Sequence, residues 1–171
     1  MGLLGKISTG NTPPTSEKEN WSSDSSGYVW ITPTDIKSLI MSDSERHLTD
    51  HGWKKARVVP ANSVLITSIA SIGKNAINTV PAAFNQQINA IVPVNNDAYF
   101  ILSAMENAMP RFEKMAGQTA TAIINKKEFE KFEVSVPTIR EQKFISDFFQ
   151  NIDNLITLHQ RAQWITEGRG K

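Results

Sequence analysis

The chain has 171 residues, no cysteine and a formal net charge of +1, with 40% hydrophobic and 20% charged residues. The lack of cysteine excludes disulfides, thiol nucleophiles and thiolate metal sites, and the length fits one domain with an appendage. There is no run of about 18 apolar residues, and the opening M-G-L-L-G-K lacks the pattern of a secretory signal. We therefore expect no membrane span and a cytoplasmic location.

The first third of the chain is predicted to consist of loop and short elements. Residues 8–27 are dominated by Ser, Thr, Asn, Gly and Pro, which is typical of a long loop, and Trp21 is expected to anchor it. The aromatic and β-branched residues 28–32 predict a short strand. Residues 32–40 indicate a turn and a short helix, and residues 48–56 a second short helix.

The middle of the chain predicts strands followed by one helix. The apolar run at residues 64–70 indicates a buried strand, and residues 72–78 a turn at Gly73 with a returning strand. Residues 84–93 predict the next strand, which begins with several amide side chains. A helix capped by Asn96 or Asp97 is then expected through about Met109, where Pro110 kinks or ends it.

Two capping boxes mark the helices of the C-terminal part. Asn125 and Glu128 have the spacing of a capping box for a brief helix, and residues 133–137 alternate as a strand. Thr138 and Glu141 have the same spacing at the start of a long helix, which we expect to run about 27 residues, or roughly 40 Å.

The long helix carries a regular apolar seam. Its positions step by four and three residues, as in a heptad pattern, at Ile145, Phe149, Ile152, Ile156, His159 and Gln163. A second apolar row follows Phe144, Phe148 and Leu155. The surface needs a partner, which is either the rest of this chain or another chain. The polar residues His159 and Gln163 are expected to set the register of such a pairing.

These elements predict an α+β fold. We expect a compact domain of five or six short twisted strands and short helices at residues 1–136, a long coiled-coil helix at residues 137–165 and a tail at residues 166–171. Basic side chains cluster at residues 46–57 and 126–131, where solvated helix faces and a binding footprint are equally open interpretations.

Catalytic and metal-binding patterns are missing from the sequence. His47 and His51 have an i, i+4 spacing but lack the Glu of the H-E-x-x-H motif, so we expect surface or DNA-facing histidines and no metal. There is no P-loop, G-x-G-x-x-G or G-x-S-x-G pattern. N-T-P-P-T at residues 11–15 resembles the Asp/Asn-Pro-Pro-aromatic loop of amino-methyltransferases, but threonines occupy its polar and aromatic positions. Catalysis by this chain is not expected.

Six stretches together resemble one family. They are G-K-I-S-T-G-N-T-P-P-T with Trp21, V-W-I-T-P-T-D, L-T-D-H-G-W, V-L-I-T-S-I-A-S-I-G-K, F-N-Q-Q-I-N-A-I-V-P and V-P-T-I-R-E-Q-K-F-I-S-D-F-F-Q-N-I-D, spanning residues 5–161 in all. In order and spacing they resemble the DNA-specificity (S) subunits of type I restriction–modification systems.

The resemblance implies a non-catalytic reader of double-stranded DNA. Family members carry two target recognition domains and two long helices, and this sequence resembles one half of that arrangement, either half-length or truncated. The implied partners are methyltransferase (M) and restriction/translocase (R) subunits and a second copy bound through the helix. S-adenosylmethionine and ATP are expected on those partners only, with no cofactor on this chain.

Residue chemistry supplies the candidate contacts. Amides suit adenine edges, Arg and Lys suit guanine, and hydroxyls suit bases or phosphates, although each amide also fits a loop-capping role. The candidate base-reading loop positions are Thr12, Thr32, Thr34, Lys74, Asn75, Asn85, Gln86, Gln87, Gln118, Thr119 and Lys126. The candidate phosphate contacts are Lys54, Lys55 and Arg57. The candidate dimerisation residues are Ile145, Phe148, Phe149, Ile152, Leu155, Ile156 and His159.

Two other functions remain open. In the first, the chain is an oligomerisation or protein-interaction module whose helix is the working part and whose basic patches are solvent surface. A more remote one is a fragment of a stand-alone methyltransferase. Loss of preference for a target duplex over random DNA would favour the interaction module.

Overall fold

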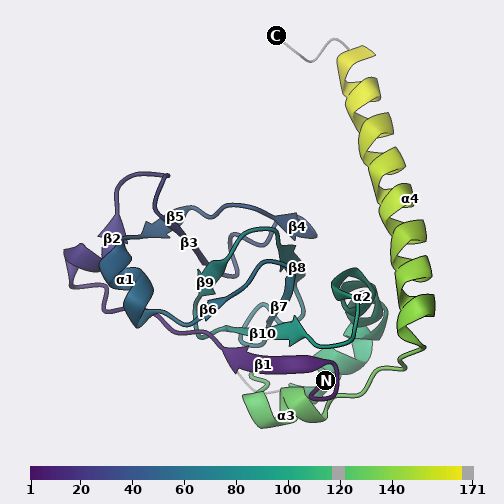
Figure 1. Ribbon diagram of the computed structural model, residues 1–171, viewed down its shortest axis with the longest axis horizontal. Coiled ribbons are helices and arrows are strands. Elements are labelled where there is room, and N and C mark those ends of the chain that lie inside the picture. Colours follow the sequence, from purple (N-terminus) through teal and green to yellow (C-terminus); the bar gives the residue numbers. More distant parts are fainter. Residues whose placement is uncertain (117–121, 167–171) are drawn as a thin grey trace.

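The computed structural model describes residues 1–116 and 122–166 (Figure 1). Within them, short strands form two five-stranded sheets. The first has the order β1 (Gly5–Thr9), β10 (Ile88–Pro93), β7 (Ser63–Thr67), β8 (Asn75–Asn78) and β4 (Ile40–Met41). The second has the order β2 (Trp21–Ser22), β5 (Arg46–Leu48), β3 (Tyr28–Ile31), β9 (Ala82–Phe84) and β6 (Val58–Val59). The predicted α+β class is confirmed.

The first sheet lies between a helix and the second sheet, which explains its unbroken apolar strands. Side chains alternate along a strand, so Val64 and Ile66 of β7 pack with helix α2 (Ala98–Met115) while Leu65 packs with Ile31 and Phe84 of the second sheet. A strand covered on both faces needs apolar residues at every position. The run at residues 64–67 is therefore fully buried.

The helix starts follow the caps expected from the sequence. The Thr49 hydroxyl accepts from the Gly52 amide at 3.2 Å, at the start of α1 (Asp50–Lys55). Asp97 caps α2, and Asn125 with Glu128 forms the capping box of α3 (Lys126–Lys131). The Thr138 amide donates to Glu141 at 2.9 Å at the start of α4 (Ile139–Thr166), so the long helix is confirmed. No helix in the described residues is long and apolar enough to cross a membrane.

Two expected elements are wrong, and a third is shorter than expected. Residues 32–40 form no helix, because Asp35 accepts from the Thr32 amide at 2.7 Å and closes a local turn that leads into β4. The strand expected at residues 84–93 is confirmed only from Ile88 to Pro93, because the Asn85 side chain accepts from the Gln87 amide at 3.0 Å and forms a turn between β9 and β10. Residues 133–137 pair with no strand among the described residues.

Two further expectations change in extent. The strands outnumber the expected five or six, because those of two or three residues are too short to show periodicity. Helix α2 continues past Pro110 to Met115, since Pro110 is exposed while Phe112, two residues on, is fully buried and holds the last turn in place.

Helix α4 runs beside α2, and its C-terminal half projects beyond the sheets (Figure 1). At its base, polar side chains join it to the domain. The Asp97 amide donates to Gln142 at 2.9 Å, and Gln142 donates to Asn96 at 3.0 Å. The Ser146 hydroxyl donates to Asp97, and the Tyr99 hydroxyl to Asp153. These contacts are called the polar clasp below.

Candidate nucleic-acid interface

The loop after β1 is held in place by its own backbone and by Asn11. The Gly10 amide donates to Ile88 at 3.1 Å and the Asn11 amide to Phe84 at 2.9 Å. A Cβ at Gly10 would stand 2.2 Å from the Phe84 carbonyl oxygen, so a side chain there is excluded. The Asn11 side chain donates to the Lys55 carbonyl at 2.9 Å and accepts from the backbone amide of Arg57 at 2.5 Å. The loop and helix α1 therefore form one fixed surface.

Several predicted base-reading residues come together at this surface. The Thr12 hydroxyl donates to Gln86 at 2.6 Å, which joins the loop after β1 to the β9–β10 turn. The Asn85 side chain donates to Gln87 at 3.0 Å and is itself buried, so it serves the loop-capping role. Gln86 is exposed and Thr12 is half-buried, so the pair lies at the outer edge of the turn.

A second group is linked to the first through β3. The Asn85 amide donates to the Ile31 carbonyl at 2.9 Å, next to Thr32. The hydroxyls of Thr32 and Thr34 are 2.8 Å apart, and Lys74 donates to the Pro33 carbonyl at 3.3 Å. These contacts place both threonines and Lys74 in one cluster.

Asn75 departs from its expected place. It lies in strand β8 and is only 3% exposed, so its assignment to a loop is wrong. Neither polar atom of its side chain has a hydrogen-bond partner among the described residues. Its amide is therefore not on the surface with Thr12.

The three candidate phosphate contacts are exposed and differ in how they are held. Lys55 forms an ion pair with Glu17 at 2.5 Å, and this hydrogen bond holds the pKa of the Glu17 carboxyl below its usual value. The Arg57 guanidinium donates to the Thr9 carbonyl. Lys54, on the same short helix, has no ion pair recorded in the described part of the chain. The backbones of Lys55 and Arg57 bond to the Asn11 side chain, so these two residues lie beside the Asn11 loop.

The remaining predicted residues lie elsewhere. Lys126 is on α3, which packs beside β1, and its ammonium is 3.6 Å from Glu130, an i, i+4 pair typical of a solvated helix face. Gln118 and Thr119 lie outside the described residues.

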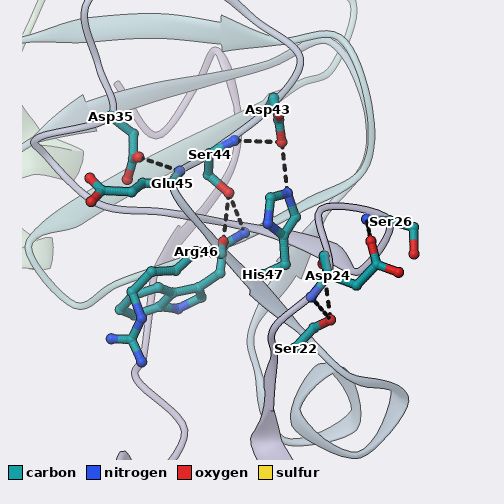
Figure 2. A network of polar contacts seen from close by, with 10 residues as sticks. Ser22, Asp24, Ser26, Asp35, Asp43, Ser44, Glu45, Arg46 and His47 are labelled. Carbon is teal, nitrogen blue, oxygen red and sulfur yellow. Dashed lines mark hydrogen bonds and ion pairs between the residues drawn. The ribbon is translucent and has the colours of Figure 1, made fainter.

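The two histidines do not share a helix face. His47 is on β5, 7% exposed, and its ring nitrogen lies 2.7 Å from Asp43 (Figure 2). The pKa of the Asp43 carboxyl is lowered, first by the Ser44 backbone amide and then by His47. His51 is on α1, 4.0 Å from Glu19. The expectation of two surface or DNA-facing histidines is therefore wrong for His47, because strand alternation turns it inward.

One residue of this region was missed as a candidate contact. Arg46 was counted only within a basic cluster, but its guanidinium carbon lies 3.7 Å from the Trp21 ring centroid and 5.4 Å from that of Trp30. The available signal was the alternation of R-H-L, which places Arg46 and Leu48 on one face of a strand. Because no strand was expected at residues 46–48, the sequence did not predict which face Arg46 would occupy.

The apolar surface of α4 divides between the domain and the solvent. Ile145 and Ile152 are half-buried, and Phe149 lines a groove of about 550 Å³ between α2 and α4. The other four candidate dimerisation residues are exposed, namely Phe148, Leu155, Ile156 and His159. The seam is therefore partly covered by its own domain, and the second row is the more open one.

This fold and surface define a binding domain whose amide, hydroxyl and basic side chains are carried on fixed loops, with a long helix at its margin. Among the described residues, no group of three or more His, Cys, Asp or Glu side chains is placed to hold a metal. The chain belongs to the family described as the type I restriction modification DNA specificity domain, which matches residues 2–164. The family resemblance of the sequence is confirmed.

Relatives in this family are longer than the chain. It is similar to the EcoR124I/EcoR124II specificity subunit of Escherichia coli, at 30% identity over 98% of this chain and 42% of that protein. It is also similar to the MjaIX specificity subunit of Methanocaldococcus jannaschii, at 27% identity over 96% and 39% of the two chains. The chain spans about two fifths of the length of these curated relatives.

Solved structures share the fold. The HsdS subunit from Thermoanaerobacter tengcongensis superposes with a TM-score of 0.69 at 18% identity, covering 95% of this chain and 38% of that one. The type I system S subunit from M. genitalium gives a TM-score of 0.66 at 16% identity, covering 98% and 41%. Helix α4 is included in a likeness of this extent.

Proposed function

We propose that the chain is a non-catalytic, sequence-specific DNA-binding subunit that reads one half of a split target. It directs adenine-N6 methylation, and restriction in the full complex, by type I M and R partner subunits. The supporting observation is the single surface formed by the Asn11 loop, the β9–β10 turn and helix α1. There, Thr12 and Gln86 are joined at 2.6 Å beside exposed cationic side chains.

The chemistry of this surface fits duplex DNA. Exposed lysine and arginine side chains such as Lys54 and Arg57 suit phosphates, which contribute affinity but no sequence information. Amides and hydroxyls on fixed loops suit base edges in the major groove. S-adenosylmethionine and ATP belong to the partner subunits, and the chain acts in the cytoplasm on DNA.

The exposed row of α4 supports self-association. Phe144 is 76% exposed and Leu155 is 65% exposed. A twofold pairing of two α4 helices would bury the second apolar row of each helix. In this proposal two copies restore the two recognition domains of longer family members.

Sequencing of methylated adenines in cells that carry this chain with its M subunit tests the reading function. Two identical readers related by a twofold axis read inverted copies, so we expect a symmetric split motif. An asymmetric motif would overturn the homodimer while leaving DNA reading intact.

Binding measurements separate DNA reading from a protein-interaction module. The assembled complex should prefer duplexes with the methylated motif over random duplexes across a range of salt concentrations. Equal affinity for both kinds of duplex would overturn sequence reading and favour the interaction module, in which α4 alone is the working part.

A further inference from the structure

Arg46 is placed among indole rings by strand pairing. On β5 it lies directly opposite Trp30 of β3, while Trp21 of β2 is opposite Leu48. Alternation puts Arg46 and Leu48 on one face of the sheet and His47 on the other. The Arg46 guanidinium therefore stacks over Trp21, with its central carbon 3.7 Å from the ring centroid.

The rings beneath Arg46 are themselves fixed. Trp21 and Trp30 meet edge to face, with centroids 4.9 Å apart. The Trp30 indole nitrogen donates to the Asn11 carbonyl and that of Trp21 to the Pro14 carbonyl, each at 3.3 Å. These two bonds tie the ring platform to the loop that carries Thr12.

The backbone at Arg46 is also held. The Ser44 hydroxyl accepts from the Trp30 amide at 3.0 Å and donates to the Arg46 carbonyl at 2.8 Å (Figure 2). Figure 2 shows the Arg46 side chain extending away from Asp43 and His47. Stacking on an indole and a bonded backbone leave the guanidinium few alternative orientations.

The guanidinium N–H groups of Arg46 have no acceptor among the described residues of the domain. Among the described residues, no hydrogen bond or ion pair of its guanidinium is recorded, and the side chain is exposed. Two carboxylates of this region are engaged elsewhere, Asp43 with His47 and Asp35 with the Thr32 and Glu45 amides. By contrast, Lys55 is paired with Glu17 and Arg57 with the Thr9 carbonyl.

We propose that Arg46 reads a guanine through the two acceptors O6 and N7 of its major-groove edge. This inference rests on the proposed DNA-reading function. A guanidinium held flat on an indole presents two parallel N–H groups in one fixed plane, which matches a planar acceptor pair. A phosphate contact needs no fixed plane and is served by flexible cations such as Lys54. Arg46 is thus a specificity-determining residue.

The test compares the wild-type complex with Arg46→Lys and Arg46→Met, both of which keep an unbranched side chain over the indoles. Affinity is measured for the methylated motif and for a panel of duplexes with single base-pair changes, over a range of salt. We expect each variant to bind the motif about 10- to 100-fold more weakly, with discrimination lost at one G·C pair only. The methylation motif in cells should relax at that same position.

Arg57→Ala is the matched control. It should weaken binding to all duplexes alike and reduce the salt slope by about one unit. If Arg46→Met behaved in this way, Arg46 would be a phosphate contact; if it changed nothing, Arg46 would only cover the indoles. Either result overturns the inference while wild-type specificity stands. A wild-type complex without preference for its motif would instead overturn the proposed function itself.

Discussion

The two faces of helix α4 differ in chemistry and in what covers them. The face against its own domain carries Gln142 and Ser146, which are 2% and 1% exposed and belong to the polar clasp. The outer face carries Phe144, Phe148 and Leu155, all exposed. At about 100° per residue, the outer row lies roughly 120–160° around the helix from Gln142.

The usual arrangement, in which a helix turns its apolar side to the core, holds in part, since Ile145 and Ile152 are half-buried; buried polar contacts are added on the same side. Hydrogen bonds are directional, so a buried polar contact fixes the direction of a helix more narrowly than apolar packing does. The clasp therefore sets how α4 leaves the domain, and the outer row stays exposed. The predictions below act on one face at a time.

The largest effect is expected from the outer face. Phe148→Asp combined with Leu155→Asp should weaken self-association at least about 100-fold. The two large apolar side chains would no longer be buried in the pairing, and two carboxylates would be buried in their place. Sedimentation velocity over a concentration range measures it. Gln160→Asp is the control, since it adds one such charge at an exposed position in the projecting half of α4, in line with Gln142 and away from the outer row.

The recognition domain should keep its thermal midpoint in the double variant, because neither side chain is part of its core. A wild-type protein that stays monomeric throughout the range, or a double variant that still dimerises, would contradict the assignment of the outer row.

A smaller effect is expected on the clasp face. Gln142→Ala should lower the free energy of unfolding by about 2–3 kcal/mol, because it leaves the Asp97 amide and the Asn96 and Pro137 oxygens without their partner. Urea unfolding measures it as a lower midpoint at constant slope. Gln160→Ala, on the exposed part of the same helix, should change the value by no more than about 0.5 kcal/mol.

Self-association should not change in Gln142→Ala beyond what unfolding removes. If both glutamine variants had the same stability, the clasp would not hold α4 to the domain, and the direction of the helix would have to depend on the groove that contains Phe149.

The clasp and the caps show what the sequence reveals and what it conceals. The caps at Thr49, Asn125 and Thr138 involve partners three residues away, and such patterns are visible in the sequence. The contact between Asp97 and Gln142 joins residues 45 apart, and no local periodicity encodes it. For that reason the apolar seam was identified while the polar anchor of the same helix was not.

The recognition surface divides in the same way. Side-chain chemistry selected Thr12 and Gln86, which the structure joins, because both occur in loop-forming stretches. It also selected Asn75, which is buried in a strand, since an amide looks the same in either setting. The position of Arg46 over the indole rings depends on the pairing of β2, β5 and β3. These three short strands adjoin one another only in the folded domain.

The smallest effect is expected at the distal end of the clasp, where Tyr99 meets Asp153. Burial raises the pKa of the Tyr99 hydroxyl, and the hydrogen bond to Asp153 raises it further. A group whose pKa is raised on folding contributes stability below its unfolded pKa of about 10 and loses it as the pH rises toward the folded value. Tyr99→Phe should therefore cost about 1 kcal/mol at neutral pH.

The stability difference between wild type and Tyr99→Phe should shrink as the pH is raised above about 10, because only the wild type then has a hydroxyl to ionise. Urea unfolding between pH 7 and pH 11 measures this difference. The pKa of Tyr28 is also raised, by its bond to Asp50, but it is common to both proteins and cancels. A difference that stays constant to pH 11 would mean that the Tyr99 hydroxyl contributes nothing to anchoring α4, and that the clasp consists of Gln142 and Ser146 alone.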